Sequence, residues 1–103
     1  MTTISIFEKA GSFAENKDVA RDIRMNEIIP AIIAKQEVTL DFDKVDAVTQ
    51  SFIHALISDL FRKFGFEVLD VVIFKSCNAT VKKIIEIVID YMQEGLSDEE
   101  TAV

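Results

Sequence analysis

Cysteine, proline, glycine and tryptophan are scarce in this chain of 103 residues, which contains one cysteine, one proline, three glycines and no tryptophan. The single cysteine, Cys77, has no partner for an internal disulfide, which argues against a small disulfide-bonded secreted scaffold. The N-terminal segment lacks a basic start followed by an apolar stretch. The apolar runs IIPAII and VLDVVIF are far shorter than the roughly 20 residues that span a bilayer. We therefore expect a cytoplasmic protein without a membrane segment.

Basic residues are also in the minority, since 11 Lys and Arg stand against 18 Asp and Glu and give a net charge of -7. An acidic surface repels both nucleic acid and anionic membranes, so neither is an expected partner. Half of the residues are apolar, which is enough for one hydrophobic core at this length. We expect a single domain over residues 1–94 and an acidic flexible tail over residues 95–103, where no packing pattern is present.

Three short runs rich in β-branched and aromatic residues predict strands, over residues 3–7 (TISIF), 37–45 (EVTLDFDKV) and 67–74 (EVLDVVIF). The first is expected at a sheet edge. The second alternates between apolar and polar residues, lies between helical segments and is expected to be central. The third is almost continuously apolar, which is typical of a parallel strand covered on both faces.

A kinked helix, or two short helices, is predicted for the segment that ends at Ile33. The apolar face rotates along this segment, and Pro30 has no N–H to donate to the carbonyl of Asn26. Two capping signals compete at its start: Asn16, or Ser12 together with Glu15 one turn earlier.

Two further helices have clearer boundaries. The first is predicted from Ser51 to Phe64, with Gly65 as the residue that ends it. Asn78 is the expected cap of a final helix. The predicted inward face of this last helix consists of Val81, Ile84, Ile85, Val88 and Met92.

The predicted order of strand, helix, strand, helix, strand, helix is that of an α/β domain, with a small parallel or mixed sheet and helices packed on it. Function in such sheets gathers at the carboxyl ends of the strands. We expect a rim there that includes Asp43, Asp46, Thr49, Gln50, Ser51, Lys75, Ser76, Cys77 and Asn78.

Catalysis is not expected from this rim, and we predict a protein that is not an enzyme and has no cofactor. Ser51 and His54 are neighbours on one helix, but no Gly-x-Ser-x-Gly turn is present. Phosphate-binding loops and zinc-ligand spacings are absent as well. Cys77 precedes a helix, where the helix dipole could lower its pKa, although a single free cysteine is more often inert packing.

An alternative function rests on the carboxylates Asp43 and Asp46 with Lys75 at the next strand end. Clustered carboxylates can hold Mg²⁺. This arrangement is similar to the acidic pocket of response-regulator receivers, and it predicts a Mg²⁺-dependent phosphoryl-acceptor or small-ligand-binding domain. The competing interpretation is a solvated acidic loop.

Ser51 also has two interpretations. At the start of a helix its hydroxyl can accept a bond from an N–H two or three residues on, worth about 1 kcal/mol, and this capping role is the favoured interpretation. A phosphate there would meet free N–H groups and the positive end of the helix dipole, so regulation at Ser51 is the alternative.

The run from LDF to TQSF, followed by VVIFKSCNATVKKIIEIVI, resembles the STAS-like domains, a family of small bacterial proteins. It is more distantly similar to STAS domains proper, the fold of anti-sigma-factor antagonists. The resemblance implies a non-enzymatic regulatory module that docks on a partner kinase-type ATPase or anti-sigma-like protein. It also implies phosphorylation at Ser51, although Gln50 and Phe52-Ile53 stand where the antagonists have Asp and Ser-Gly.

The expected contact surface is therefore Ser51 with Thr49, Gln50, Ser76 and Asn78. A homodimer is a further alternative, formed through an apolar patch around Ile28, Ile29, Ile32 and Ile33.

Overall fold

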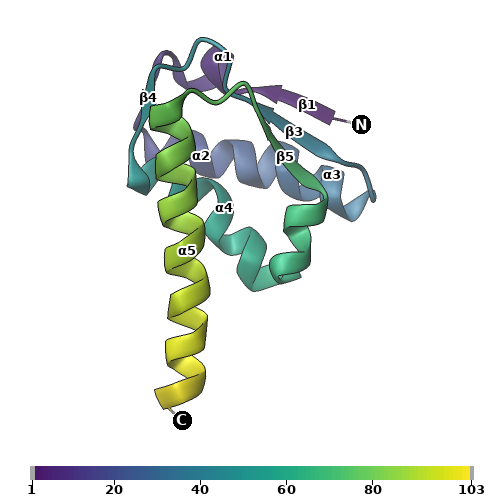
Figure 1. Cartoon of the computed structure of the whole chain (residues 1–103). Coiled ribbons are helices and arrows are strands. Elements are labelled where there is room, and N and C mark those ends of the chain that lie inside the picture. The colour runs from purple at the N-terminus through teal and green to yellow at the C-terminus, as the bar shows by residue number, and fades with distance from the viewer. Residues whose placement is uncertain (1, 103) are drawn as a thin grey trace.

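The computed structural model describes residues 2–102, and the side chains of residues 2–93. Its main sheet contains β1 (Thr2–Ser5), β3 (Val38–Asp41) and β5 (Val72–Lys75), all parallel, in the order β1-β3-β5 (Figure 1). The predicted places of the first strand at an edge and the second at the centre are confirmed.

A second, smaller sheet was not predicted. It pairs β2 (Phe13–Ala14) with β4 (Ala47–Val48) in parallel. Strands of two residues are too short to show a period of two in the sequence. This pair brings the segment before α2 beside the segment that leads into α4.

The first predicted strand extends too far, because Ile6 and Phe7 belong to a short helix, α1 (Ile6–Ala10). Ser5 causes the change of direction. Its hydroxyl accepts a hydrogen bond from the Glu8 N–H at 3.2 Å and caps the helix.

The kinked helix is present as three consecutive parts: α2 (Lys17–Ile23), the π-helical segment η1 (Arg24–Ile28) and α3 (Ile29–Ile33). The π segment ends at Ile28, two residues before Pro30, whose missing N–H leaves the carbonyl of Asn26 in that segment without its regular helical donor. Asn16 is the cap, since its side-chain oxygen accepts bonds from the N–H groups of Asp18 and Val19. The alternative start at Ser12 and Glu15 is wrong.

Helix α4 (Gln50–Phe64) ends at Gly65 as predicted, where φ is 76°. The prediction of a strand over residues 67–74 is wrong in its first half. Phe66–Asp70 forms the 3₁₀ helix η2, closed by the turn bond from the Val71 N–H to the Val68 carbonyl. Ile73 on β5 is 41% exposed, so this strand is not covered on both faces either.

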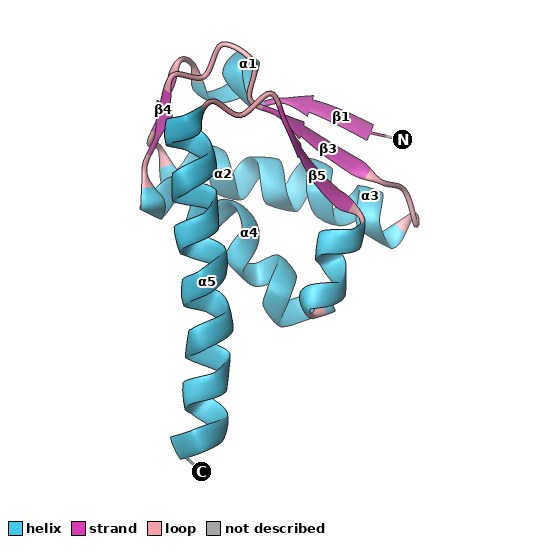
Figure 2. Ribbon diagram, viewed as in Figure 1, coloured by secondary structure: helices cyan, strands magenta, loops and turns pink. Residues whose placement is uncertain are grey.

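Helix α5 (Ala79–Ala102) is the longest element and runs past α4 (Figure 2). The predicted inward face is confirmed for four of its residues, with Ile84 only partly buried. The acidic flexible tail predicted over residues 95–103 stays a prediction, because the side chains of these residues lie outside the described ones. The buried residues of the face are Val81, Ile85, Val88 and Met92.

The helices gather on one side of the main sheet (Figures 1 and 2). Ile4, Leu40 and Val38 of that side are buried, whereas Thr3 on the opposite side is exposed. The result is a mixed α/β domain of parallel sheets with helices, which is the predicted fold class. Its order of elements differs from the predicted one, because it also contains α1, β2, β4 and η2. Within the described residues, the helices include none that is long and apolar enough to cross a membrane.

Candidate functional site

Thr49, not Ser51, is the N-cap of α4. Its Oγ1 accepts a hydrogen bond from the Phe52 N–H at 3.0 Å, and its backbone is extended, with φ -93° and ψ 157°. The predicted capping role of Ser51 is therefore wrong by two residues. Either hydroxyl suits a cap, and the choice depends on β4, which keeps the chain extended up to Val48.

Ser51 consequently occupies the second position of α4, where it is exposed. No side chain or backbone group among the described residues makes a hydrogen bond to its hydroxyl. Ser51 therefore does not cap α4, although the sequence had suggested that it would, and it is exposed to solvent.

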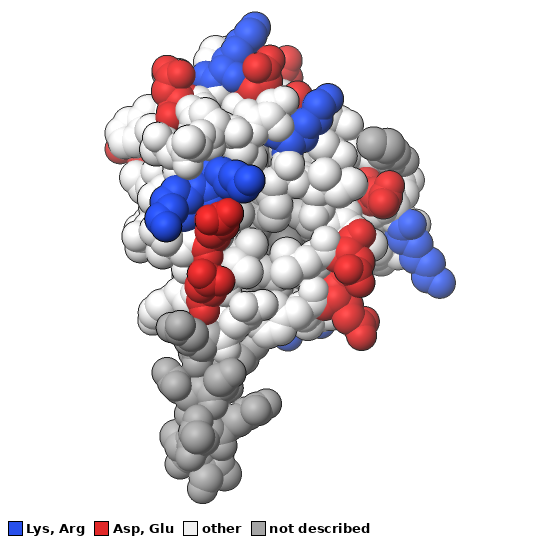
Figure 3. Space-filling model, viewed as in Figure 1, with Lys and Arg blue, Asp and Glu red and all other residues white. Residues whose placement is uncertain are grey.

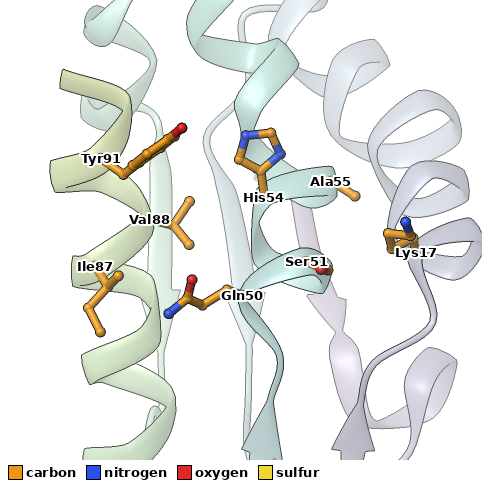
Figure 4. Close-up of a pocket in the computed structure, with 8 residues that line it drawn as sticks. All are labelled: Lys17, Gln50, Ser51, His54, Ala55, Ile87, Val88 and Tyr91. Carbon is orange, nitrogen blue, oxygen red and sulfur yellow. The ribbon is translucent and has the colours of Figure 1, made fainter. Parts of the chain in front are cut away.

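A hollow of about 420 Å³ lies beside Ser51, between α4, the start of α2 and the middle of α5 (Figure 4). We call it the Ser51 hollow. In Figure 4, Gln50 extends toward α5, whereas Ser51 lies on the side of α4 that faces Lys17. The residues that line the hollow are Lys17, Gln50, Ser51, His54, Ala55, Ile87, Val88 and Tyr91.

The lining of the Ser51 hollow is divided by chemistry. Val88 is buried, but Tyr91 is 67% and Ile87 36% exposed, so two large apolar side chains of α5 are left uncovered. Lys17 and the start of α4 provide positive charge on the other side, which favours an anion. The volume is in the range of sites that accept a small molecule or an anchoring side chain.

Sequence reasoning named His54 only as a neighbour of Ser51, and it did not single out Lys17, Ile87 or Tyr91. Helix α5 brings Ile87 and Tyr91 to α4 from more than 30 positions away, and no local pattern signals that approach. The sign that the sequence offers is that Ile87 and Tyr91 are large apolar residues outside the predicted inward face of α5.

Gln50 joins Ser51 in this hollow, but Ser76 and Cys77 of the predicted rim do not. Ser76 and Cys77 line a separate hollow of about 450 Å³ beside the beginning of α5. No residue lines both hollows, although both use the same stretch of α5: Ile85, Glu86 and Ile89 line the second one, and Ile87, Val88 and Tyr91 line the Ser51 hollow. The rim expected from the sequence is thus divided between two places.

Asn78 has a structural task at this end of the domain. Its amide nitrogen donates to the carbonyls of Val45 and Asp46, at 3.3 and 2.9 Å, while its oxygen accepts from the Val81 N–H at 2.8 Å. With these bonds Asn78 caps α5 and also fixes the loop before β4.

The carboxylates of the alternative interpretation do not assemble into a metal site. Asp41 accepts a bond from the Asp43 N–H at 2.9 Å and lies opposite Lys75 in the sheet register. The Asp46 N–H donates to the carbonyl of Ser12 at 2.7 Å. Across the residues that the structure describes, no group of three or more His, Cys, Asp or Glu side chains is placed to hold a metal ion.

Cys77 differs from the reactive thiol that a helix N-terminus could produce. Partial burial raises the pKa of its thiol; Lys82 acts in the opposite direction, and Asp41 adds to the increase. The net direction is upward, opposite to the lowering that the helix dipole could produce, and this agrees with the interpretation of Cys77 as an unreactive thiol. Little of this thiol is ionised at neutral pH.

Charged side chains on the face seen in Figure 3 surround a broad uncharged area, and basic and acidic groups both lie on its border. Neither sign of charge dominates the coloured part of this face. A strong attraction to partners of one sign of charge is therefore not expected at this face.

The model of one protein family, described as a STAS-like domain of unknown function (DUF4325), matches residues 20–82, which is more than half of the chain. The chain belongs to this family. The matched part of the STAS-like domain includes β3, β4, α4 and β5, with Ser51, whereas Lys17, Ile87 and Tyr91 lie outside it. Searches among curated proteins and among solved structures gave no match.

Proposed function

We propose that this STAS-like domain is a non-enzymatic regulatory module that binds a partner protein through the Ser51 hollow. The partner class is a kinase-type ATPase or an anti-sigma-like protein, as for the anti-sigma-factor antagonists that the sequence resembles. Phosphorylation of Ser51 changes the affinity. The observation that carries the proposal is the exposed Ser51 hydroxyl, which Thr49 relieves of capping and which lies in a partly apolar hollow.

Tyr91 and Ile87 are the anchors of the proposed contact. Large apolar and aromatic side chains that become buried at the centre of an interface contribute most of its binding energy. Both side chains are well exposed in the free domain, and Val88 provides a buried floor between α5 and α4.

A phosphate on Ser51 is compatible with the fold. It would add roughly two negative charges at the positive end of a 15-residue helix, on the side of α4 that faces Lys17. The same charge opposes docking, because a partner that covers the hollow must remove water from it. Phosphorylation therefore weakens binding without unfolding the domain.

The test is affinity capture from the native cells, with wild-type protein and two charge-introducing variants. Tyr91→Glu places a charge in the hollow, and Ile73→Glu places the same charge on an exposed apolar residue of the sheet. Proteins retained by the wild type are identified by mass spectrometry, purified and measured for Kd.

We expect Tyr91→Glu to raise the Kd of the retained partner by about tenfold or more, and Ile73→Glu to leave it unchanged. Equal affinities for all three proteins would show that the hollow is not the docking site. Circular dichroism of each variant verifies that the fold is retained.

A further inference from the structure

Arg24 is unusual because it is buried without full hydrogen bonding. Its side chain lies in the π-helical segment η1, and the residue is 8% exposed. One terminal nitrogen donates to the carbonyl of Ala55, and the other lies 3.2 Å from the Asp59 carboxylate. Its Nε is buried and has no partner in the described part of the chain. An apolar residue would fill this position without the desolvation cost of a guanidinium.

The surroundings of Arg24 gather positive charge in an acidic protein. Asp59 contacts two arginines, since its second oxygen lies 3.2 Å from Arg62. Lys63 follows on the same exposed end of α4. The local count is three cations against one carboxylate, which is opposite to the net charge of -7 for the chain.

Exposed apolar side chains accompany these cations. Met25 is 53% and Ile33 65% exposed, and Ile29 between them is half-buried. A hollow of about 300 Å³ is lined by the cations on one hand and by Met25 and Ile29 on the other. We call it the Arg24 hollow, and its lining consists of Arg24, Met25, Ile29, Asp59, Arg62 and Lys63.

We infer that the Arg24 hollow is a second docking site, separate from the Ser51 hollow, for an acidic amphipathic segment of a partner protein. Carboxylates of that segment pair with Arg62 and Lys63, whose N–H donors are largely unused in the structure. Apolar side chains of the same segment cover Met25 and Ile29. Methionine suits such a surface because its flexible side chain adapts to different partners.

Three features favour this occupant. The charge of the hollow is complementary to an acidic segment, and its apolar part to one face of an amphipathic helix. The π segment carries both Arg24 and Met25, and such segments are frequent at functional sites. The basic cluster is too small, and the chain too acidic, for a nucleic acid to be the occupant.

The probe is a synthetic helical peptide of leucine, alanine and glutamate, added to the isotopically labelled full-length chain. We expect its addition to shift the NMR amide signals of Met25, Ile29, Arg62 and Lys63. A matched peptide with lysine in place of glutamate should cause no shift there. Binding should weaken as salt is added.

The chain offers a matched control for the cations. Arg62→Ala/Lys63→Ala removes two charges from the hollow, and Lys82→Ala/Lys83→Ala removes two equally exposed charges from α5. The first pair should reduce affinity for the acidic peptide by about tenfold, and the second should leave it unchanged.

Equal losses from both pairs, shifts centred on other residues, or no peptide-dependent shift would overturn the inference. Shifts of the same four signals that depend only on protein concentration would do so as well, because they would make a second copy the occupant. Tyr91→Glu should not affect the peptide, so this result is independent of the proposed docking at Ser51.

Discussion

Thr49 and Ser51 are two hydroxyl residues, two positions apart, with different surroundings. Thr49 satisfies the Phe52 N–H at the start of α4, whereas the Ser51 hydroxyl is exposed at the edge of a hollow. At the scale of single residues, this division leaves Ser51 available for regulation. Modification of Thr49, by contrast, would remove the cap of the helix.

Replacement of each residue by alanine tests this division. Thr49→Ala should lower the free energy of unfolding by about 1 kcal/mol, since it removes a cap. Ser51→Ala should change it by less than about 0.5 kcal/mol, as for other exposed positions. Urea denaturation followed by circular dichroism measures both. If Ser51→Ala lowered the free energy of unfolding more than Thr49→Ala does, Ser51 rather than Thr49 would be the cap of α4.

At the scale of elements, Asn78 connects three parts of the domain. It caps α5 and holds the carbonyls of Val45 and Asp46 in the loop between β3 and β4. Since β4 leads directly into Thr49 and α4, these bonds also help to position the start of the helix that carries Ser51.

Asn78→Ala should therefore cost more than loss of an ordinary cap. We expect the free energy of unfolding to fall by roughly 2–3 kcal/mol, because a cap is lost and two carbonyls lose their donor. Ser76→Ala, at an exposed position of the same loop, is the control and should be nearly neutral, because the Ser76 side chain makes no hydrogen bond within the described residues. A loss of only about 1 kcal/mol for Asn78→Ala would mean that the bonds to the loop add no stability.

The long helices and the strands of the main sheet were predictable, whereas α1, the β2–β4 pair and the 3₁₀ helix η2 were not. Helix α4 and the inward face of α5 follow from apolar spacing over many residues. Gly65 marks the end of α4, and Asn78 marks the start of α5. The pairing of β2 with β4 depends on contacts between distant segments. Residues 66–70 are apolar enough for a strand, but the turn bonds after Gly65 select a 3₁₀ helix.

At the scale of the whole molecule, the candidate site was predictable only in part. Ser51 and Gln50 lie in the hollow, but Ser76 lies elsewhere and Asn78 serves the fold. The rim was predicted from residues that follow the carboxyl ends of the strands. The hollow, by contrast, forms where α5 passes α4. A single sequence does not contain that path in any local pattern.

The two hollows also give the domain two different faces. The Ser51 hollow combines exposed Tyr91 and Ile87 with a serine, and the Arg24 hollow combines basic groups with Met25. Arg24 and Lys17 belong to the same α2–η1 segment but line different hollows. No residue lines both hollows, so the two proposed docking sites can be changed by separate substitutions.

The central claim is that charge at Ser51 controls docking, and the most direct test is the Kd of the captured partner for wild type, Ser51→Ala and Ser51→Asp. We predict that Ser51→Asp raises the Kd by about tenfold or more, because docking must desolvate the added charge. Ser51→Ala should stay within about twofold of wild type. Equal Kd values for all three proteins, measured by isothermal titration calorimetry, would contradict the account.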